Sequence, residues 1–157
     1  MKLISKDNKI IVFLYKRINF KQINLENYFK KLFIKFKEDY HIELNGYYSI
    51  NIYIDKFYGS VIEIENEDLD YYNYFNQIDM EVKLNDNVFL YEIDYEYLNK
   101  SIINNSNIYK LKDKLYIQVK DNNILNKILE YSNIIYGEKI KYILRNSKKV
   151  KLWKNQL

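Results

Sequence analysis

The chain lacks several residue types on which whole classes of protein chemistry depend. Its 157 residues include no cysteine, proline, alanine or threonine, only three glycines and a single histidine, His41. The absence of cysteine excludes disulfides, thiol nucleophiles, zinc–thiolate sites and iron–sulfur clusters. One imidazole excludes two-histidine metal sites, and three glycines provide no Walker-type or dinucleotide-binding loop. We therefore expect neither a cofactor nor a bound metal.

Long apolar runs are missing as well. No run approaches the ~18 residues of a membrane span. Near the N-terminus, Lys6, Asp7 and Lys9 interrupt the apolar residues, so this segment lacks the apolar centre of a signal peptide. These absences predict no membrane insertion and a cytoplasmic location.

Lysine, asparagine, isoleucine and tyrosine are abundant. Codons for these four can be written almost wholly with A and T, whereas the four absent types require G or C. The composition therefore indicates an AT-rich genome, as in many low-GC bacteria, and it makes the 18 tyrosines weak support for a tyrosine-based function. The chain is 48% hydrophobic and 17% aromatic, which suffices for a folded core.

The net charge of +4 is distributed unevenly. Residues 1–40 carry ten basic and four acidic side chains, residues 41–99 carry two and thirteen, and residues 100–157 carry thirteen and four. The three blocks thus have net charges of +6, −11 and +9. Two interpretations stay open: the blocks pack together and neutralise one another, or they form separate charged surfaces that steer partners.

Hydrophobic periodicity predicts the elements of the N-terminal half. Apolar segments on either side of Asp7-Asn8 indicate a hairpin, and Asn24 is a typical cap for an amphipathic helix that ends near residue 40. Strict alternation predicts a second hairpin over 47–65, in which Gly59 supplies a positive φ. The apolar stripe expected on the helix comprises Leu25, Tyr28, Phe29, Leu32, Phe33 and Phe36.

The remaining patterns indicate further hairpins and helices. In order, they predict a short helix within 67–76, a strand 77–84 that returns through the turn 85–87 as 88–93, a polar loop or linker at 99–107, a hairpin at 108–119, helices at 122–135 and 138–145, and a final strand or tail at 148–157. Hairpins and helices without strict β-α-β alternation predict an α+β fold, with mostly antiparallel sheet packed against three to four helices. We expect a single domain over 1–157, with a sub-division into 1–98 and 107–157 left open.

The first candidate site is the acidic and aromatic stretch ENEDLDYYNYFNQIDMEV, residues 65–82. Its acids could be solvated carboxylates, or they could form a protein-binding surface with the neighbouring tyrosines, which make good interface anchors. General acid–base catalysis would require two carboxylates about 5–9 Å apart, and no calcium-binding loop pattern is present. The protein-binding hypothesis involves Asp68, Asp70, Tyr71, Tyr72 and Tyr74.

His41 and the basic C-terminal third are the other candidates. His41 lies at a predicted helix end, where an imidazole commonly contacts the last carbonyls, and Glu43 could orient it, but no nucleophile is identifiable. The C-terminal cations surround a tryptophan, a combination that nucleic-acid-binding proteins use for phosphate contact and base stacking. These residues are Arg145, Lys148, Lys149, Lys151, Trp153 and Lys154.

Two C-terminal runs resemble a known family. IYKLKDKLYIQV (108–119) and ILEYSNIIYGEKIKYILRNSKKV (128–150) are similar to the closing part of MecA-type adaptor proteins of low-GC Gram-positive bacteria. That part has a comparable hairpin, a helix ending near Glu-Tyr and a last helix before a short basic or polar end. The resemblance implies a non-enzymatic adaptor that hands substrates to the ClpC unfoldase, and it assigns no individual residue.

Taken together, these features predict a macromolecule-binding protein with a protein partner. Few side-chain types remain for chemistry once cysteine, paired histidines and glycine-rich loops are excluded. Nucleic-acid binding through the basic C-terminal third is the alternative. A carboxylate-dependent hydrolase or nuclease is a further alternative, and it requires three or more acids to converge in a cleft.

Overall fold

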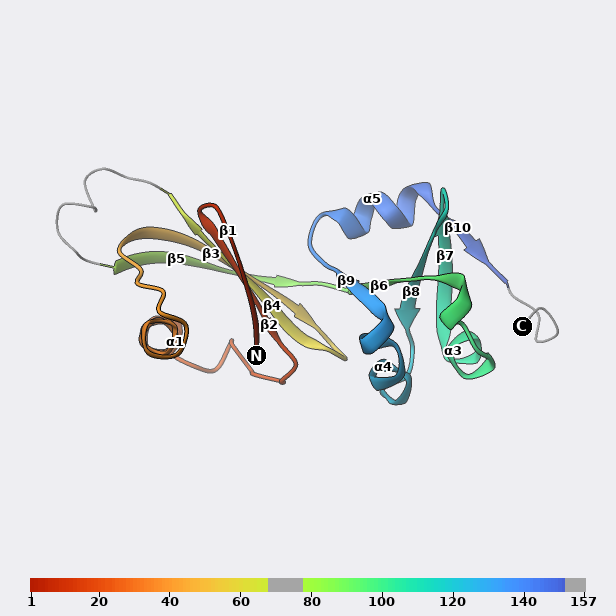
Figure 1. Cartoon of the computed structure of the whole chain (residues 1–157), viewed down its shortest axis with the longest axis horizontal. Coiled ribbons are helices and arrows are strands. Elements are labelled where there is room, and N and C mark those ends of the chain that lie inside the picture. Colours follow the sequence, from red (N-terminus) through yellow and green to blue (C-terminus); the bar gives the residue numbers. More distant parts are fainter. Residues whose placement is uncertain (68–77, 152–157) are drawn as a thin grey trace. The chain divides into compact units, whose positions relative to one another are not determined.

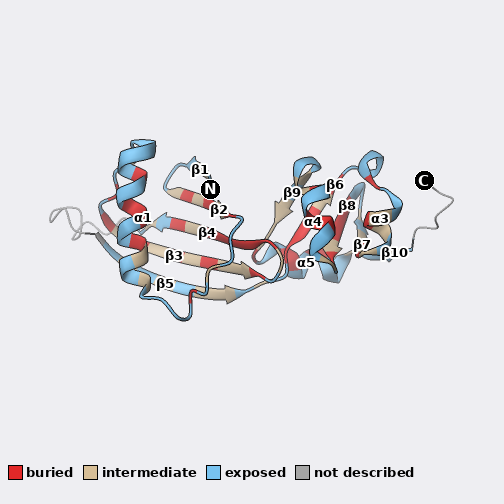
Figure 2. Ribbon diagram, turned by 90° about the horizontal axis from the view of Figure 1, so that it is seen from below, coloured by how far each residue is buried: buried red, intermediate tan, exposed pale blue. Residues whose placement is uncertain are grey.

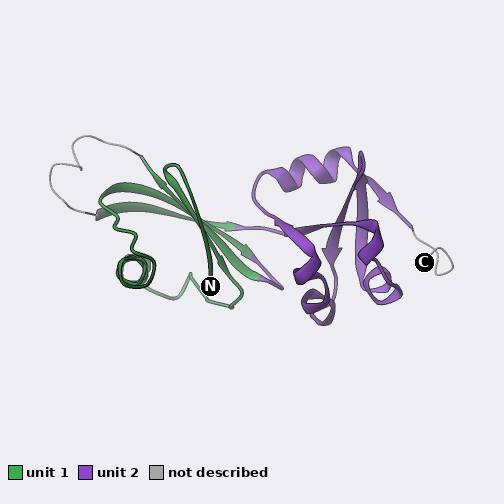
Figure 3. Ribbon diagram, in the orientation of Figure 1, with its two compact units in different colours: residues 1–54, 59–85 green, residues 55–58, 86–157 purple. Residues whose placement is uncertain are grey.

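The computed structural model describes residues 1–67 and 78–151, which form two compact units (Figure 3). Unit 1 comprises residues 1–54 and 59–85, and unit 2 comprises residues 55–58 and 86–157. Each unit contains a five-stranded sheet with at least one helix packed against it, which confirms the predicted α+β fold with mostly antiparallel sheet. Among the described residues, no helix has the length and apolar character that crossing a bilayer requires.

Unit 1 is a sheet with one long helix on one face (Figure 1). The strand order is β1-β2-β4-β3-β5, and the pairs β1–β2 and β2–β4 are antiparallel. The elements are β1 (Lys2–Lys6), β2 (Lys9–Leu14), α1 (Leu25–Tyr40), β3 (Gly46–Asp55), β4 (Gly59–Asn66) and β5 (Ile78–Asp86).

Helix α1 begins and ends as its sequence predicts. The Asn24 side chain accepts a hydrogen bond from the Asn27 backbone N–H at 3.1 Å, which satisfies one of the unpaired donors of the first turn. At the other end His41 adopts the left-handed conformation (φ 57°), and its N–H bonds the Phe36 carbonyl. His41 therefore has a structural role as the C-terminal cap.

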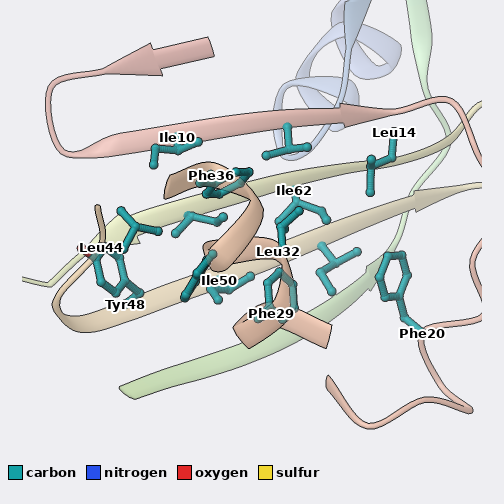
Figure 4. Packing of buried hydrophobic residues seen from close by; sticks show 14 residues of the cluster. Ile10, Leu14, Phe20, Phe29, Leu32, Phe36, Leu44, Tyr48, Ile50 and Ile62 are labelled. Carbon is teal, nitrogen blue, oxygen red and sulfur yellow. The ribbon is translucent and has the colours of Figure 1, made fainter. Parts of the chain in front are cut away.

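The apolar stripe of α1 packs against alternate residues of the sheet (Figure 4). Buried positions recur along one side of the helix and along the central strands (Figure 2). The shared core contains Ile10, Val12, Leu14, Phe20, Phe29, Leu32, Phe33, Phe36, Leu44, Tyr48, Ile50, Ile52, Ile62 and Ile64. Period-two alternation places the intervening strand residues on the opposite face of the sheet, which α1 does not cover.

Gly59 is the first residue of β4, and its backbone has a conformation that other residues rarely adopt. Its φ is +126°, and a Cβ atom at this position would lie 2.5 Å from the Leu14 carbonyl oxygen. The close pairing of β2 with β4 therefore requires a residue without a side chain here. The predicted turn role of Gly59 is confirmed.

Unit 2 is a sheet with helices on both faces (Figure 1). The strand order is β10-β7-β8-β6-β9, and all four neighbouring pairs are antiparallel. The elements are β6 (Leu90–Ile93), η1 (Tyr95–Tyr97), α3 (Lys100–Asn104), β7 (Ser106–Leu111), β8 (Lys114–Val119), α4 (Asn122–Ile128), η2 (Leu129–Tyr131), β9 (Ser132–Ile135), α5 (Lys139–Asn146) and β10 (Lys148–Val150). Helix α5 packs through Ile140 and Ile143 onto Leu90 and Tyr116, while α3 and α4 lie on the other face.

A buried carboxylate organises the start of unit 2. Asp55 is 7% exposed, and its Oδ2 accepts hydrogen bonds from the backbone N–H groups of Phe57 (2.9 Å) and Tyr58 (2.8 Å). Its Oδ1 accepts a third from the N–H of Phe89 at 2.9 Å. The rings of Tyr58 and Phe89 are also in contact, with centroids 5.8 Å apart. One side chain thus fixes two segments that lie far apart in the sequence.

The structure corrects three local predictions. Strands β5 and β6 do not form a hairpin through 85–87, since β5 pairs in the sheet of unit 1 and β6 lies between β8 and β9 in unit 2. The polar segment 99–107 is not a loop: Asn99 caps the short helix α3 with a 3.0 Å bond to the Ile102 N–H, and β7 follows. The helix predicted over 122–135 ends at Ile128, because 132–135 pair with β6 as strand β9.

Candidate functional site

The five residues of the acidic–aromatic hypothesis lie outside the described residues. Asp68, Asp70, Tyr71, Tyr72 and Tyr74 all fall in 68–77, as does the short helix predicted there. The flanking acids are described: Glu63 and Glu65 lie on β4, Asp79 and Glu81 lie on β5, and Glu67 directly follows β4.

The flanking acids lie at strand positions on the sheet face that α1 leaves uncovered. There Tyr47 donates a hydrogen bond from its hydroxyl to Glu81 Oε2 at 3.2 Å, and Asp79 is exposed. Lys9 forms ion pairs with Glu63 (3.6 Å) and Glu65 (4.0 Å) across β2 and β4. The N-terminal basic block and the central acidic block are therefore partly neutralised within unit 1. Among residues 1–67 and 78–151, no three acidic or histidine side chains gather as a metal-binding group.

A second acidic–aromatic surface, which the sequence did not reveal, is formed in unit 2. The rings of Tyr97 and Tyr131 stack with centroids 4.7 Å apart and an interplanar angle of 14°. Both rings stay accessible, since Tyr97 is 39% exposed and Tyr131 is 49% exposed. We call this pair the tyrosine platform.

The register of two strands explains why these tyrosines meet. In the antiparallel pair β6–β9, Ile93 lies opposite Ser132. The 3-10 turn η1 follows Ile93, and η2 directly precedes Ser132, so both turns are at the same end of the sheet. Buried residues anchor each turn, Leu98 behind η1 and Ile128 before η2. The platform is therefore held by the core of unit 2, although its two tyrosines are separated by more than thirty positions.

The surroundings of the platform are acidic. Asp94 directly precedes η1, Glu96 lies within η1 and Glu130 lies within η2, and all three residues are exposed. None of them forms an ion pair with a lysine or arginine in the part of the chain that the structure describes. Accessible aromatic faces beside unneutralised carboxylates favour cationic groups, and above all the planar guanidinium of arginine.

The basic C-terminal residues are only partly brought together. Lys149 and Lys151 line a groove of about 370 Å³ with Lys120, while Trp153 and Lys154 lie outside the described residues. Arg145 lies in the last turn of α5 and does not line this groove. We call the groove formed around Lys120, Lys149 and Lys151 the lysine groove.

Strand pairing forms the lysine groove and brings several lysine side chains close to one another. Ser106 lies opposite Val119, and the Lys120 N–H bonds the Asn105 carbonyl at 3.0 Å, which fixes Lys120 beside the start of β7. Next to the groove, Lys148 lies directly opposite Lys110. Like charges in this position repel one another, so an anion bound nearby would relieve an unfavourable interaction.

The sequence contains a recognisable pattern at the tyrosine platform. The motif Asp94-Tyr95-Glu96-Tyr97 is itself an acidic–aromatic run, and Glu130-Tyr131 repeats its pattern. Their convergence could not be inferred, because it depends on the pairing of β6 with β9, and 132–135 were expected to be helical. Lys120 was missed for a similar reason, since the pairing of β7 with both β8 and β10 brings it near Lys149.

Comparisons with known proteins give no relative. No protein-family model matches the chain, and neither does any curated protein or any solved structure. The resemblance of 108–119 and 128–150 to MecA-type adaptors therefore stays a prediction.

Proposed function

We propose that the protein is a non-enzymatic protein-binding module, and that unit 2 recognises an arginine-rich segment of its partner through the tyrosine platform. The observation that carries this proposal is the accessible stack of Tyr97 and Tyr131 beside unneutralised Asp94, Glu96 and Glu130. Accessible, rigidly held tyrosines are typical anchors of protein interfaces.

The physical basis is the complementarity of aromatic faces and carboxylates to guanidinium. An arginine side chain can stack on a tyrosine ring while its N–H groups bond a neighbouring carboxylate in bidentate fashion. A cation–π contact at an exposed site contributes about 0.5–1 kcal/mol, so several arginines are needed for a stable complex. A segment with two or more arginines is therefore the expected ligand.

The proposal is tested by fluorescence anisotropy with a labelled arginine-rich peptide and a matched lysine-rich peptide. We expect the arginine peptide to bind more tightly, and the double variant Tyr97→Ser, Tyr131→Ser to weaken its binding about tenfold. The control variant is Tyr142→Ser, because Tyr142 is 60% exposed on α5 of the same unit. Equal binding by the control and the double variant would contradict a role of the platform.

A narrower proposal is that this binding serves an adaptor role. The resemblance to MecA-type adaptors supports it, since the similar runs correspond to β7–β8 and to the segment from the end of α4 through β10, all within unit 2. Its test is direct binding of the purified chain to a purified ClpC unfoldase, measured with and without the arginine peptide as competitor. An absence of binding at micromolar concentrations of both proteins would contradict the adaptor role and leave the peptide experiment unaffected.

Nucleic-acid binding is a second candidate, which the lysine groove favours. Three lysines and the polar side chains of Asn104 and Asn107 could contact a phosphate backbone. The logarithm of affinity for single-stranded nucleic acid should fall with the logarithm of salt by about 0.7 per phosphate neutralised. Lys149→Gln with Lys151→Gln should flatten that slope, whereas Lys139→Gln with Lys141→Gln on α5 should not. Identical slopes for both pairs would refute the use of the groove.

A further inference from the structure

Unit 1 contains a groove whose chemistry the proposed binding functions do not use. It has a volume of about 530 Å³, within the ~300–1,000 Å³ range of small-molecule sites. One wall is a single side of α1, and the other is the end of β2 with the segment that follows it. The lining residues are Met1, Leu14, Tyr15, Lys16, Ile18, Tyr28, Lys31, Leu32 and Lys35.

The groove has an apolar floor. Leu14 and Leu32 are buried members of the unit 1 core, and both appear in Figure 4. Ile18 and Tyr28 are half-buried and pack against the same core. Tyr28 is held by edge-to-face contacts with Phe20 (5.4 Å between centroids) and Phe29 (5.2 Å). The floor is therefore preformed and fixed by the packing of α1 on the sheet.

The rim is cationic. Lys16, Lys31 and Lys35 are exposed, and no acidic residue is among the described residues that line the groove. Within residues 1–67 and 78–151, none of these three lysines forms an ion pair. Their charge is therefore available to a ligand.

The other lysines of α1 provide an internal contrast. Lys30 pairs with Glu26 at 2.9 Å and Lys37 pairs with Glu43 at 3.6 Å, and both line a different groove, next to Phe33 and Leu44. The helix thus separates neutralised lysines on one side from unneutralised lysines on the other. A uniformly solvated lysine face would not give this division.

We propose that this groove binds a single-chain amphipathic anion, a fatty carboxylate, with its hydrocarbon chain on the apolar floor and its head group among the three lysines. Burial of methylenes against Leu14, Ile18 and Leu32 supplies affinity that grows with chain length. The lysines attract the carboxylate and select against a neutral chain of the same length. This site lies in unit 1, so its test is independent of the tyrosine platform and the lysine groove.

Isothermal titration with monomeric dodecanoate is the direct test, with octanoate, acetate and dodecanol as comparison ligands. We expect affinity to rise from octanoate to dodecanoate by at most about fourfold per added methylene. Acetate, which has no chain, should not bind measurably. Dodecanol should bind about tenfold more weakly than dodecanoate, because it lacks the charge.

Matched pairs of lysine variants on α1 test whether dodecanoate binding depends on the lysines of this groove or only on the net positive charge of the protein. Lys31→Gln with Lys35→Gln should weaken dodecanoate binding about tenfold, whereas Lys30→Gln with Lys37→Gln, which changes the net charge equally, should weaken it less than twofold. Equal thermal melting of both double variants and the parent chain confirms that each is folded.

The proposal is overturned if dodecanoate does not bind, if dodecanol binds as tightly as dodecanoate, or if the two lysine pairs have equal effects. Binding to vesicles of anionic phospholipid that requires Lys31 and Lys35, without binding of monomeric dodecanoate, would also overturn it, since the ligand would then be a lipid surface.

Discussion

Asp55 provides the sharpest test of how unit 2 is held together. Replacing it with alanine removes three hydrogen bonds to an ionised acceptor, those from Phe57, Tyr58 and Phe89. The N–H groups of Tyr58 and Phe89 belong to buried residues and would lose their partner without access to water. Each buried donor left unsatisfied costs about 1–3 kcal/mol, so we expect the free energy of unfolding to fall by about 4 kcal/mol.

The loss is measurable by urea unfolding followed by circular dichroism. With a slope of about 1–3 kcal/mol per molar urea, the midpoint for unit 2 should fall by at least about 1.3 M. Hydrogen exchange of the backbone amides in β6 should accelerate in parallel, because the bond from Phe89 fixes the residue just before that strand.

Two further variants test whether the effect of Asp55→Ala arises from the lost hydrogen bonds. Asp55→Asn keeps the shape but replaces one acceptor oxygen with a donor, so it should satisfy one side of the network and lose about half as much stability. Asp113→Asn, at an exposed position in the turn between β7 and β8, should change the unfolding free energy by less than about 0.5 kcal/mol. If Asp55→Ala unfolds at the same urea concentration as the parent chain, the reasoning from buried donors is refuted.

Three other predictions concern stability. Gly59→Ala should lower the unfolding free energy of unit 1 by at least about 2 kcal/mol, since the new Cβ would clash with the Leu14 carbonyl, and an unchanged urea midpoint would contradict the close approach. Asn24→Ala should cost about 1 kcal/mol through loss of the cap on α1, whereas Asn24→Ser should cost almost nothing; equal costs would argue against capping. Burial raises the pKa of Tyr28 and of Tyr48, so folding favours their neutral forms: this stability is fully present below the unfolded-state pKa of about 10 and is lost as the pH rises through the higher folded-state pKa. Tyr28→Phe should therefore reduce the alkaline loss of stability measured between about pH 9 and 12, and an unaltered pH profile would refute that assignment.

Local patterns predicted those elements whose determinants lie close together in the sequence. Helix α1 follows from its three- and four-residue apolar spacing and from Asn24, both of which act within a few turns of the chain. The hairpin of β3 and β4 follows from strict alternation and from Gly59. The α+β class follows from the sum of such elements.

Predictions that depended on distant partners were wrong. Residues 132–135 have apolar spacing compatible with a helix, but they become a strand because β6 offers a free edge for pairing. Segment 99–107 is polar enough for a loop, yet Asn99 caps a turn whose Ile102 is buried. The turn predicted at 85–87 was wrong too: β5 continues to Asp86, and residues 87–89 connect strands of two different sheets, which no local pattern can distinguish from a hairpin.

By itself the sequence determined the chemistry that this protein can use and the local elements that carry it. Composition excludes thiol and two-histidine chemistry, because the side chains are not present. Periodicity sets which faces of the elements are apolar, because helices and strands repeat at fixed intervals. Tertiary structure alone decided which polar residues meet: Tyr97 with Tyr131, Lys120 with Lys149, and three lysines around the groove of unit 1. The physical reason is that strand register and helix docking bring together residues far apart in sequence, and no local spacing encodes those distances.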